Sequence, residues 1–185
     1  MNLLRHLPNA LTAFRLVAAP ALAVLLERHL FPLALLLFAL AGFSDALDGY
    51  LAKRLAPGSR FGAWLDPAAD KILMLVAFVV LTLLNETPLW LTIIVIGRDI
   101  AIVAAIILIR ILALPLIIAP LPIGKVSTVV QVIYVGLVLL MLAARTDVEW
   151  ARGAAEFMVS AVTIASWIAY GQLLLRTLAP GRRTA

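Results

Sequence analysis

The 185-residue sequence is 64% apolar and 14% charged, whereas a soluble globular protein is about half apolar and about a quarter charged. This composition excludes a soluble domain and indicates an integral membrane protein. The absence of Cys excludes disulfides, thiolate nucleophiles and Cys-ligated zinc, and the basic residues behind the net charge of +5 are spread over loops, so we expect anionic membrane lipids as partners and no nucleic acid.

Six apolar runs follow one another along the chain, each close to the roughly 20 residues that span a bilayer. We expect helices at residues 8–26, 30–51, 66–85, 88–109, 124–143 and 154–176. The first run carries polar residues and has no small-residue cleavage site, so we interpret it as a retained helix and not a signal peptide. The Pro-rich apolar stretch at 111–123 is too short to span and is expected to lie at the interface or against the bundle. The expected fold is one all-α integral membrane domain, residues 1–185, with six transmembrane helices in one bundle.

The loops between these runs differ in their basic residues, and this difference predicts the orientation. An even number of spans puts both termini on one side, and Lys and Arg accumulate in cytoplasmic loops. The terminal segments and the second and fourth loops hold nine such residues: Arg5, Lys53, Arg54, Arg60, Arg110, Lys125, Arg176, Arg182 and Arg183. The opposite loops hold three: Arg28, Arg145 and Arg152. We therefore predict that both termini are cytoplasmic.

Four aspartates lie in the stretch SDALDGYLAKRLAPGSRFGAWLDPAADK, residues 44–71, which we call the aspartate segment. On a helix, Asp45 and Asp48 would lie about 60° apart around the axis. Asp66 and Asp70 would lie about 40° apart. Each pair thus shares one helix face, and a short loop between the helices predicts antiparallel neighbours whose four carboxylates converge on one cavity.

These carboxylates need compensation, because a charge at membrane depth costs roughly 2.5 to 3.5 kcal/mol and four like charges repel one another. Hard divalent cations such as Mg²⁺ or Mn²⁺ prefer oxygen ligands, and two of them would offset about four negative charges. The segment therefore predicts a two-metal site for phosphoryl-type chemistry. The structural alternative makes Asp66 a helix N-cap before Pro67 and pairs the first two aspartates with Lys53 or Arg54.

Small residues accompany the aspartates at Gly49, Ala52 and Gly62. They would let a flat ligand such as a nucleotide base approach the backbone closely. Ordinary close packing between helices is the alternative explanation.

The spacing of these residues is that of a known family. Asp45, Asp48, Gly49, Ala52, Gly62, Asp66 and Asp70 fit the pattern D-x2-D-G-x2-A-R-x8-G-x3-D-x3-D of the CDP-alcohol phosphatidyltransferases, which the sequence resembles. Lys53 stands at the Arg position of the pattern and keeps the charge without the planar fork. The stretches LPNALTAFR at 7–15, GRD at 97–99 and IGKVSTVVQ at 123–131 are similar to the phosphatidylglycerophosphate synthase and cardiolipin synthase branch. The resemblance covers the first five helices, and the sixth adds little.

The resemblance implies a homodimeric six-helix enzyme that transfers the phosphatidyl group of CDP-diacylglycerol to an alcohol and releases CMP. It implies that Asp45, Asp48 and Asp66 bind two divalent cations, and that Asp70 contacts a metal and acts as general base. The residues that it implies for CDP binding are Asp48, Gly49, Ala52, Lys53, Gly62 and Asp66. For this branch the acceptor is phosphatidylglycerol or glycerol 3-phosphate, and the location is a bacterial cytoplasmic membrane with the active site facing the cytoplasm.

Two basic residues outside the aspartate segment are candidates for the acceptor's phosphate. Arg98 lies near the middle of the fourth helix, where it is not expected to face lipid, and Lys125 opens the fifth. The alternatives are that Arg98 pairs with one of the four aspartates and that Lys125 snorkels to the interface. Asp99 points about 100° away from Arg98 on a helix, so we expect no simple pair between them. The Arg98–Asp99 dipeptide and the polar run at 127–131 resemble the cardiolipin synthases and favour phosphatidylglycerol.

A cation transporter or channel is the competing class, since carboxylates within a membrane also mark ion paths. The aspartates cluster at one end of their helices and do not line a route across the bilayer. The sequence also has no paired broken helices of the transporter kind. An enzyme is therefore the favoured interpretation.

Overall fold

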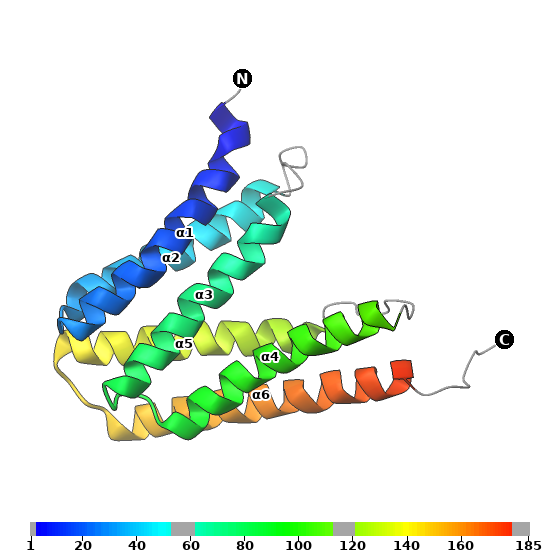
Figure 1. Ribbon diagram of the computed structural model, residues 1–185. Helices are drawn as coiled ribbons and strands as arrows, with labels where there is room; N and C mark the ends of the chain where they lie inside the picture. The colour runs from blue at the N-terminus through cyan, green and yellow to red at the C-terminus, as the bar shows by residue number, and fades with distance from the viewer. Residues whose placement is uncertain (1–2, 53–61, 113–120, 179–185) are drawn as a thin grey trace. The chain divides into compact units, whose positions relative to one another are not determined.

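A computed structural model describes residues 3–52, 62–112 and 121–178, with side chains described for residues 13–44, 71–112 and 121–178 (Figure 1). The six helices are α1 (Leu3–Glu27), α2 (Phe31–Ala52), α3 (Gly62–Leu83), α4 (Leu89–Ile111), α5 (Pro122–Ala144) and α6 (Glu149–Leu178). The described ranges contain no strand. Each of the six predicted apolar runs thus forms a helix, and the all-α prediction is confirmed.

Three helices begin several residues before the predicted positions, because hydropathy locates the apolar part of a helix and not its end. α3 begins at Gly62, where the prediction was residue 66, so Asp66 lies in the second turn. The interpretation of Asp66 as an N-cap with Pro67 in the first helical position is therefore wrong. α6 likewise begins at Glu149, whose charge suits the positive end of the helix dipole.

Within the described residues, α4, α5 and α6 are each long and apolar enough to cross a membrane. Shorter apolar stretches cover Phe31–Ser44 in α2 and Lys71–Leu83 in α3. The protein is accordingly treated as an integral membrane protein with at least three helices that suit a bilayer.

The turns after α1, α3 and α5 share one geometry. His29, Asn85 and Arg145 have φ values of 55°, 62° and 53°, the left-handed region that usually takes Gly. In each turn this residue donates its N–H to the carbonyl three residues earlier, and the next residue donates to the carbonyl five residues earlier, at 2.8–3.3 Å. These are Schellman caps, and they satisfy the last carbonyls of each helix within connections of three, five and four residues.

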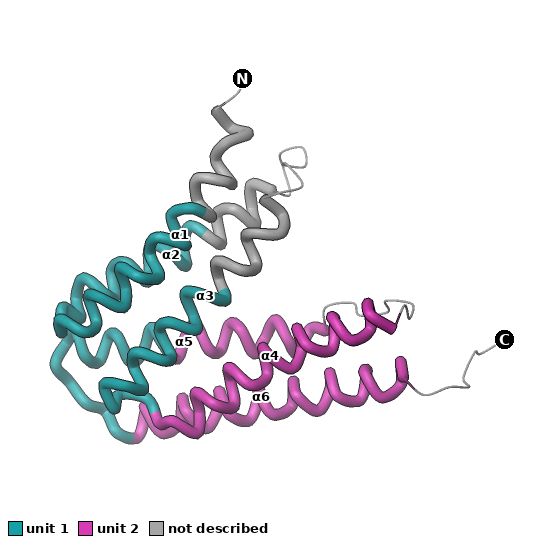
Figure 2. The backbone as a smooth tube through the Cα atoms, in the orientation of Figure 1, with its two compact units in different colours: residues 1–87, 135–149 teal, residues 88–134, 150–185 magenta. Residues whose placement is uncertain are grey.

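Two compact units make up the chain (Figure 2). The first contains α1, α2, α3 and the end of α5, and within it α1 packs against both α2 and α3. Its core is mostly apolar, with Leu22, Leu26, Ala34, Ala77 and Phe78 fully buried, although Arg15 of α1 is buried as well. Alanines at these contacts let the helix backbones approach closely.

The second unit contains α4, the start of α5 and most of α6, and its core is markedly polar. Arg98, Ser127, Gln131, Thr163 and Ser166 are all buried there. Polar groups in such surroundings must be hydrogen bonded to one another, and this requirement organises the unit.

Candidate active site

The four aspartates lie at the two helix ends that residues 53–61 join. Asp45 and Asp48 occupy the last turns of α2, and Asp66 and Asp70 occupy the first three turns of α3. α2 and α3 run in opposite directions in the first unit, and both pack on α1 (Figure 1). The predicted placement of both pairs on helices, near one shared connection, is therefore confirmed at the level of the backbone.

The side chains of this region lie outside the described residues, as does the whole of Lys53. The backbone places Gly49 and Ala52 near the end of α2 and Gly62 at the start of α3. Convergence of the carboxylates and the contacts to CDP therefore stay predictions. Among the side chains that are described, no three carboxylate or imidazole groups gather as a metal site.

The second unit holds Arg98 on the inner face of α4, with 4% of the residue exposed. The prediction that Arg98 does not face lipid is thus confirmed. A guanidinium in such a position requires hydrogen-bond acceptors and a counter-charge, because burying a charged group without such partners has a large free-energy cost. Both requirements are met by residues of α4, α5 and α6.

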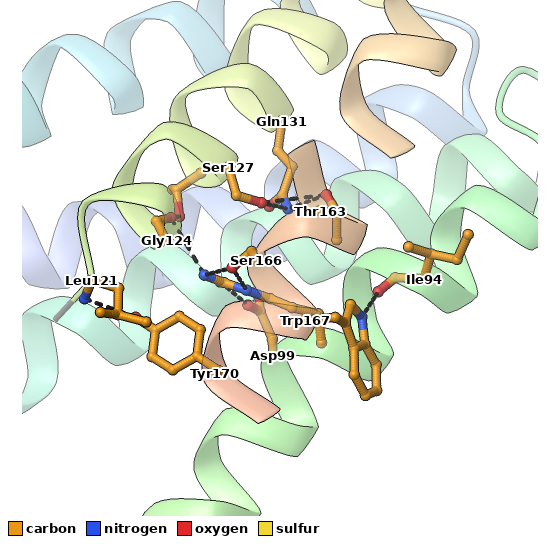
Figure 3. Close-up of polar contacts among 12 residues, drawn as sticks. Ile94, Asp99, Leu121, Gly124, Ser127, Gln131, Thr163, Ser166, Trp167 and Tyr170 are labelled. Carbon is orange, nitrogen blue, oxygen red and sulfur yellow. Dashed lines mark hydrogen bonds and ion pairs between the residues drawn. The ribbon is translucent and has the colours of Figure 1, made fainter. Parts of the chain in front are cut away.

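Four residues surround the guanidinium, and together with Arg98 they form what we call the Arg98 cluster (Figure 3). Nε and Nη2 donate to Oγ of Ser166 at 3.1 and 3.0 Å. Nη1 donates to Oδ1 of Asp99 at 2.7 Å, and Nη2 donates to the carbonyl of Gly124 at 3.4 Å. The ring of Tyr170 lies 5.5 Å from the guanidinium carbon, within cation–π range.

The contact with Asp99 corrects the expectation that adjacent residues on α4 would not pair. Backbone spacing directs the two Cβ atoms about 100° apart, but the long Arg side chain bends back so that its guanidinium reaches the neighbouring carboxylate. The counter-charge of Arg98 in the described structure is therefore Asp99.

Because Gly124 has no side chain, the Tyr170 hydroxyl and the Arg98 guanidinium can both approach its backbone closely. A Cβ at this position would lie 2.7 Å from the Tyr170 hydroxyl and 2.9 Å from Nη2 of Arg98. The Tyr170 hydroxyl also accepts the N–H of Leu121, at 3.3 Å, just before α5 begins. Lys125 follows Gly124 directly and is exposed, so α5 brings a second cation next to the carbonyl that accepts from Arg98.

A second polar group joins α5 to α6 one turn further along. Nε2 of Gln131 donates to Oγ of Ser127 at 3.1 Å and to Oγ1 of Thr163 at 3.4 Å, and the two hydroxyl oxygens lie 3.3 Å apart. Such contacts between helices stabilise a bundle in lipid, where no water competes for them. The polar run of α5 thus has a packing role.

Sequence reasoning missed the contribution of α6. Its hydroxyl residues at 160, 163 and 166 recur every third position in an otherwise apolar helix, and this stripe could have signalled a buried polar face. Thr163 and Ser166 are indeed fully buried and hydrogen bonded, whereas the Ser160 hydroxyl donates to a carbonyl of its own helix.

A cavity of about 150 Å³ lies between α4 and α6 within the second unit. Arg98, Trp167 and Tyr170 line it together with small and aliphatic side chains, including Ala101 and Ala105 of α4. Among the residues that line this mostly apolar cavity, Arg98 is the charged one.

Comparison with known proteins identifies the family of the chain. The sequence model of the CDP-alcohol phosphatidyltransferases matches residues 5–175. The chain belongs to this family. The match to the CDP-alcohol phosphatidyltransferases includes the aspartate segment and extends far into α6, so the expectation that the sixth helix adds little to the likeness was too narrow.

Named members of the family resemble the chain over different lengths. A "Probable phosphatidylglycerophosphate synthase" of Mycobacterium tuberculosis is 31% identical over 189 residues, covering 97% of the chain and 87% of that protein. A cardiolipin synthase/mitochondrial hydrolase fusion protein of Schizosaccharomyces pombe is 34% identical, covering 89% of the chain and 30% of that protein. The cardiolipin synthase (CMP-forming) of Homo sapiens is 42% identical over 110 residues, covering 59% of the chain and 36% of that protein. The chain thus matches about a third of the length of these cardiolipin synthases.

Proposed function

We propose that the protein is a phospholipid-biosynthesis enzyme that transfers the phosphatidyl group of CDP-diacylglycerol to a glycerol-type acceptor and releases CMP. The observation that carries the proposal is the family's aspartate pattern at the joined ends of α2 and α3, in a chain that matches the family over residues 5–175. The relatives' names support phosphatidylglycerol or glycerol 3-phosphate as acceptor. Of the two, the Arg98–Asp99 dipeptide favours phosphatidylglycerol.

Two divalent cations, Mg²⁺ or Mn²⁺, are proposed to bind at the aspartate segment. Asp45, Asp48 and Asp66 would hold them, with Asp70 contacting one, and an all-carboxylate donor set fits hard cations. When bound, the cations would neutralise the diphosphate and the charge that develops on the departing CMP.

The transfer forms one phosphorus–oxygen bond and breaks another. The acceptor's hydroxyl oxygen bonds to the phosphorus next to diacylglycerol, and the bond from that phosphorus to the bridging oxygen breaks, so CMP leaves with the bridging oxygen. Asp70 takes the hydroxyl proton, because an alcohol of high pKa needs a base close by. The residues proposed to bind the CDP moiety are Asp48, Gly49, Ala52, Lys53, Gly62 and Asp66.

The acceptor's phosphate is assigned to Arg98 and Lys125. Support comes from the cavity that Arg98 helps to line and from the position of Lys125 beside Gly124, whose carbonyl accepts from Arg98, in the first turn of α5. Charge-assisted hydrogen bonds from an arginine fork are strong and directional, which suits recognition of a phosphate.

The proposed setting is a bacterial cytoplasmic membrane, crossed six times by a homodimeric enzyme whose termini and active site face the cytoplasm. The nine-to-three bias of basic residues supports the orientation. Reporter fusions after Glu86 and at the C-terminus test it. A cytoplasmic signal from the Glu86 fusion would overturn this topology.

The function is tested by incubating purified protein in lipid vesicles with CDP-diacylglycerol, Mg²⁺ and each acceptor in turn, and measuring CMP. We expect CMP to be released only when an acceptor is present, and we expect EDTA to stop this release. Release that persists in EDTA would refute the two-metal site, and no release with either acceptor would refute the enzyme and favour the ion-path alternative.

A further inference from the structure

The hydroxyl of Ser166 contacts the guanidinium of Arg98 in a way that fixes its plane. One oxygen, fully buried on α6, accepts both the Nε and the Nη2 protons at 3.1 and 3.0 Å (Figure 3). Because the guanidinium is rigid and planar, holding two adjacent N–H groups sets the direction of the others.

The remaining contacts leave one edge of the guanidinium weakly held. Among the described residues, the hydrogen bonds of Arg98 use four of its five N–H groups: two to Ser166, one to Asp99 and one to Gly124. The contact with the Gly124 carbonyl, at 3.4 Å, is long for a hydrogen bond and is the easiest to exchange. The edge between Nη1 and Nη2 is therefore where a phosphate oxygen can accept a hydrogen bond.

The association of α4 with α6 does not depend on Ser166 alone. The neighbouring residue Trp167 donates its Nε1 proton to the carbonyl of Ile94 at 3.1 Å, and this second link also joins the two helices. The two helices thus share a hydrogen bond besides those between Ser166 and Arg98.

We propose that Ser166 is a positioning residue, which turns the Nη1–Nη2 edge of Arg98 toward the acceptor's phosphate, so that the Ser166 hydroxyl sets acceptor affinity without itself touching the substrate. This inference rests on the proposed function, in which Arg98 binds that phosphate. Gly124 supports the same arrangement, because a side chain there would displace the guanidinium.

The test is Ser166→Ala in the full-length protein, with CMP release measured while each substrate is varied. We expect the apparent KM for the acceptor to rise about tenfold, as expected when a hydrogen bond to a charged group is lost, while kcat and the KM for CDP-diacylglycerol stay near wild type. Ser166→Thr keeps the hydroxyl and is expected to restore most of the acceptor affinity. Ser160→Ala is the matched control, since that hydroxyl donates only within its own helix in the described structure, and it should change neither KM.

Arg98→Ala separates failure of the inference from failure of the proposed function. If Arg98→Ala raises the acceptor's KM and Ser166→Ala does not, the acceptor site stands and the positioning role is wrong. If Ser166→Ala raises both KM values equally and lowers the melting temperature, the serine is only structural and the inference is overturned. If Arg98→Ala raises only the KM for CDP-diacylglycerol, the acceptor assignment itself is refuted.

Discussion

The aspartate segment and the Arg98 cluster handle charge in opposite ways. The first places four carboxylates on the joined ends of α2 and α3, a set of like charges that calls for cations from outside the chain. The second balances the charge of Arg98 with the adjacent Asp99 and holds three of its N–H groups with acceptors from α5 and α6. One region is suited to recruit charge, and the other is suited to hold a charge in a fixed orientation.

This difference predicts opposite effects on stability. Replacing a carboxylate in the aspartate segment relieves repulsion, so the metal-free protein should melt at the same or a higher temperature. Replacing Arg98 leaves the partly buried Asp99 without its 2.7 Å partner and leaves Ser166 with unused hydrogen-bonding capacity, so the melting temperature should fall. Thermal unfolding of the variants in detergent checks both signs.

The largest effect on turnover is expected from the proposed metal ligands. Asp45→Asn, Asp48→Asn and Asp66→Asn should each lower kcat at least about 10³-fold, since a lost ligand removes several kcal/mol of charge stabilisation. CMP release by purified variants measures this. Asp147→Asn, the same change in the turn after α5, is the control and should stay near wild type. Near-normal turnover in any of the three ligand variants would remove that residue from the metal site.

A smaller loss should follow Asp70→Asn, which sharpens the roles within the aspartate segment. Loss of a general base lowers kcat by roughly 10²-fold, with less change in the binding of CDP-diacylglycerol. Comparing kcat with the KM for CDP-diacylglycerol separates the two possibilities. Equal losses in rate and binding would mean that Asp70 is only a ligand.

The Arg98 cluster is expected to act on the other substrate. Arg98→Ala should raise the acceptor's KM roughly 10- to 100-fold and leave that of CDP-diacylglycerol nearly unchanged, because it removes a charged hydrogen-bond partner from one substrate alone. Lys125→Ala should raise it less, since an exposed ammonium is already solvated. An unchanged acceptor KM in both variants would require the acceptor pocket to be placed elsewhere.

The smallest effect is expected outside both regions, at the turn after α5. Arg145 has φ 53°, and Gly adopts this conformation without the cost of roughly 1 kcal/mol that a Cβ incurs. Arg145→Gly should therefore raise the melting temperature slightly and leave kcat and both KM values unchanged. Arg145→Ala keeps a Cβ and is the control. A lower melting temperature for the glycine variant would show that the Arg145 side chain itself stabilises the turn.

The two regions also differ in how far the sequence could predict them. Hydropathy located all six helices, because a span in lipid must be apolar over about 20 residues. It missed the early starts of α3 and α6, where Gly62 and Glu149 begin helices beyond the apolar core. The positions of the four aspartates on α2 and α3 could be predicted, because the angle between residues on a helix depends only on their spacing in the sequence.

The Arg98 cluster could be predicted only in part, because its contacts join residues far apart in the chain. The sequence indicated that Arg98 is buried, since lipid exposure of an arginine is costly. It did not indicate Ser166, 68 positions away, or the bend that brings Arg98 to Asp99. Both depend on how α4, α5 and α6 pack and on the rotamers that this packing permits.

The most direct measurement supplies purified wild-type protein with Mg²⁺, CDP-diacylglycerol labelled in its phosphatidyl group, and both acceptors together. Phosphatidyl transfer predicts one labelled phospholipid for each CMP released, and the favoured acceptor makes that product cardiolipin. Phosphatidylglycerophosphate as the only labelled product would refute phosphatidylglycerol as the acceptor. Labelled phosphatidic acid, or no CMP at all, would contradict the transfer reaction itself.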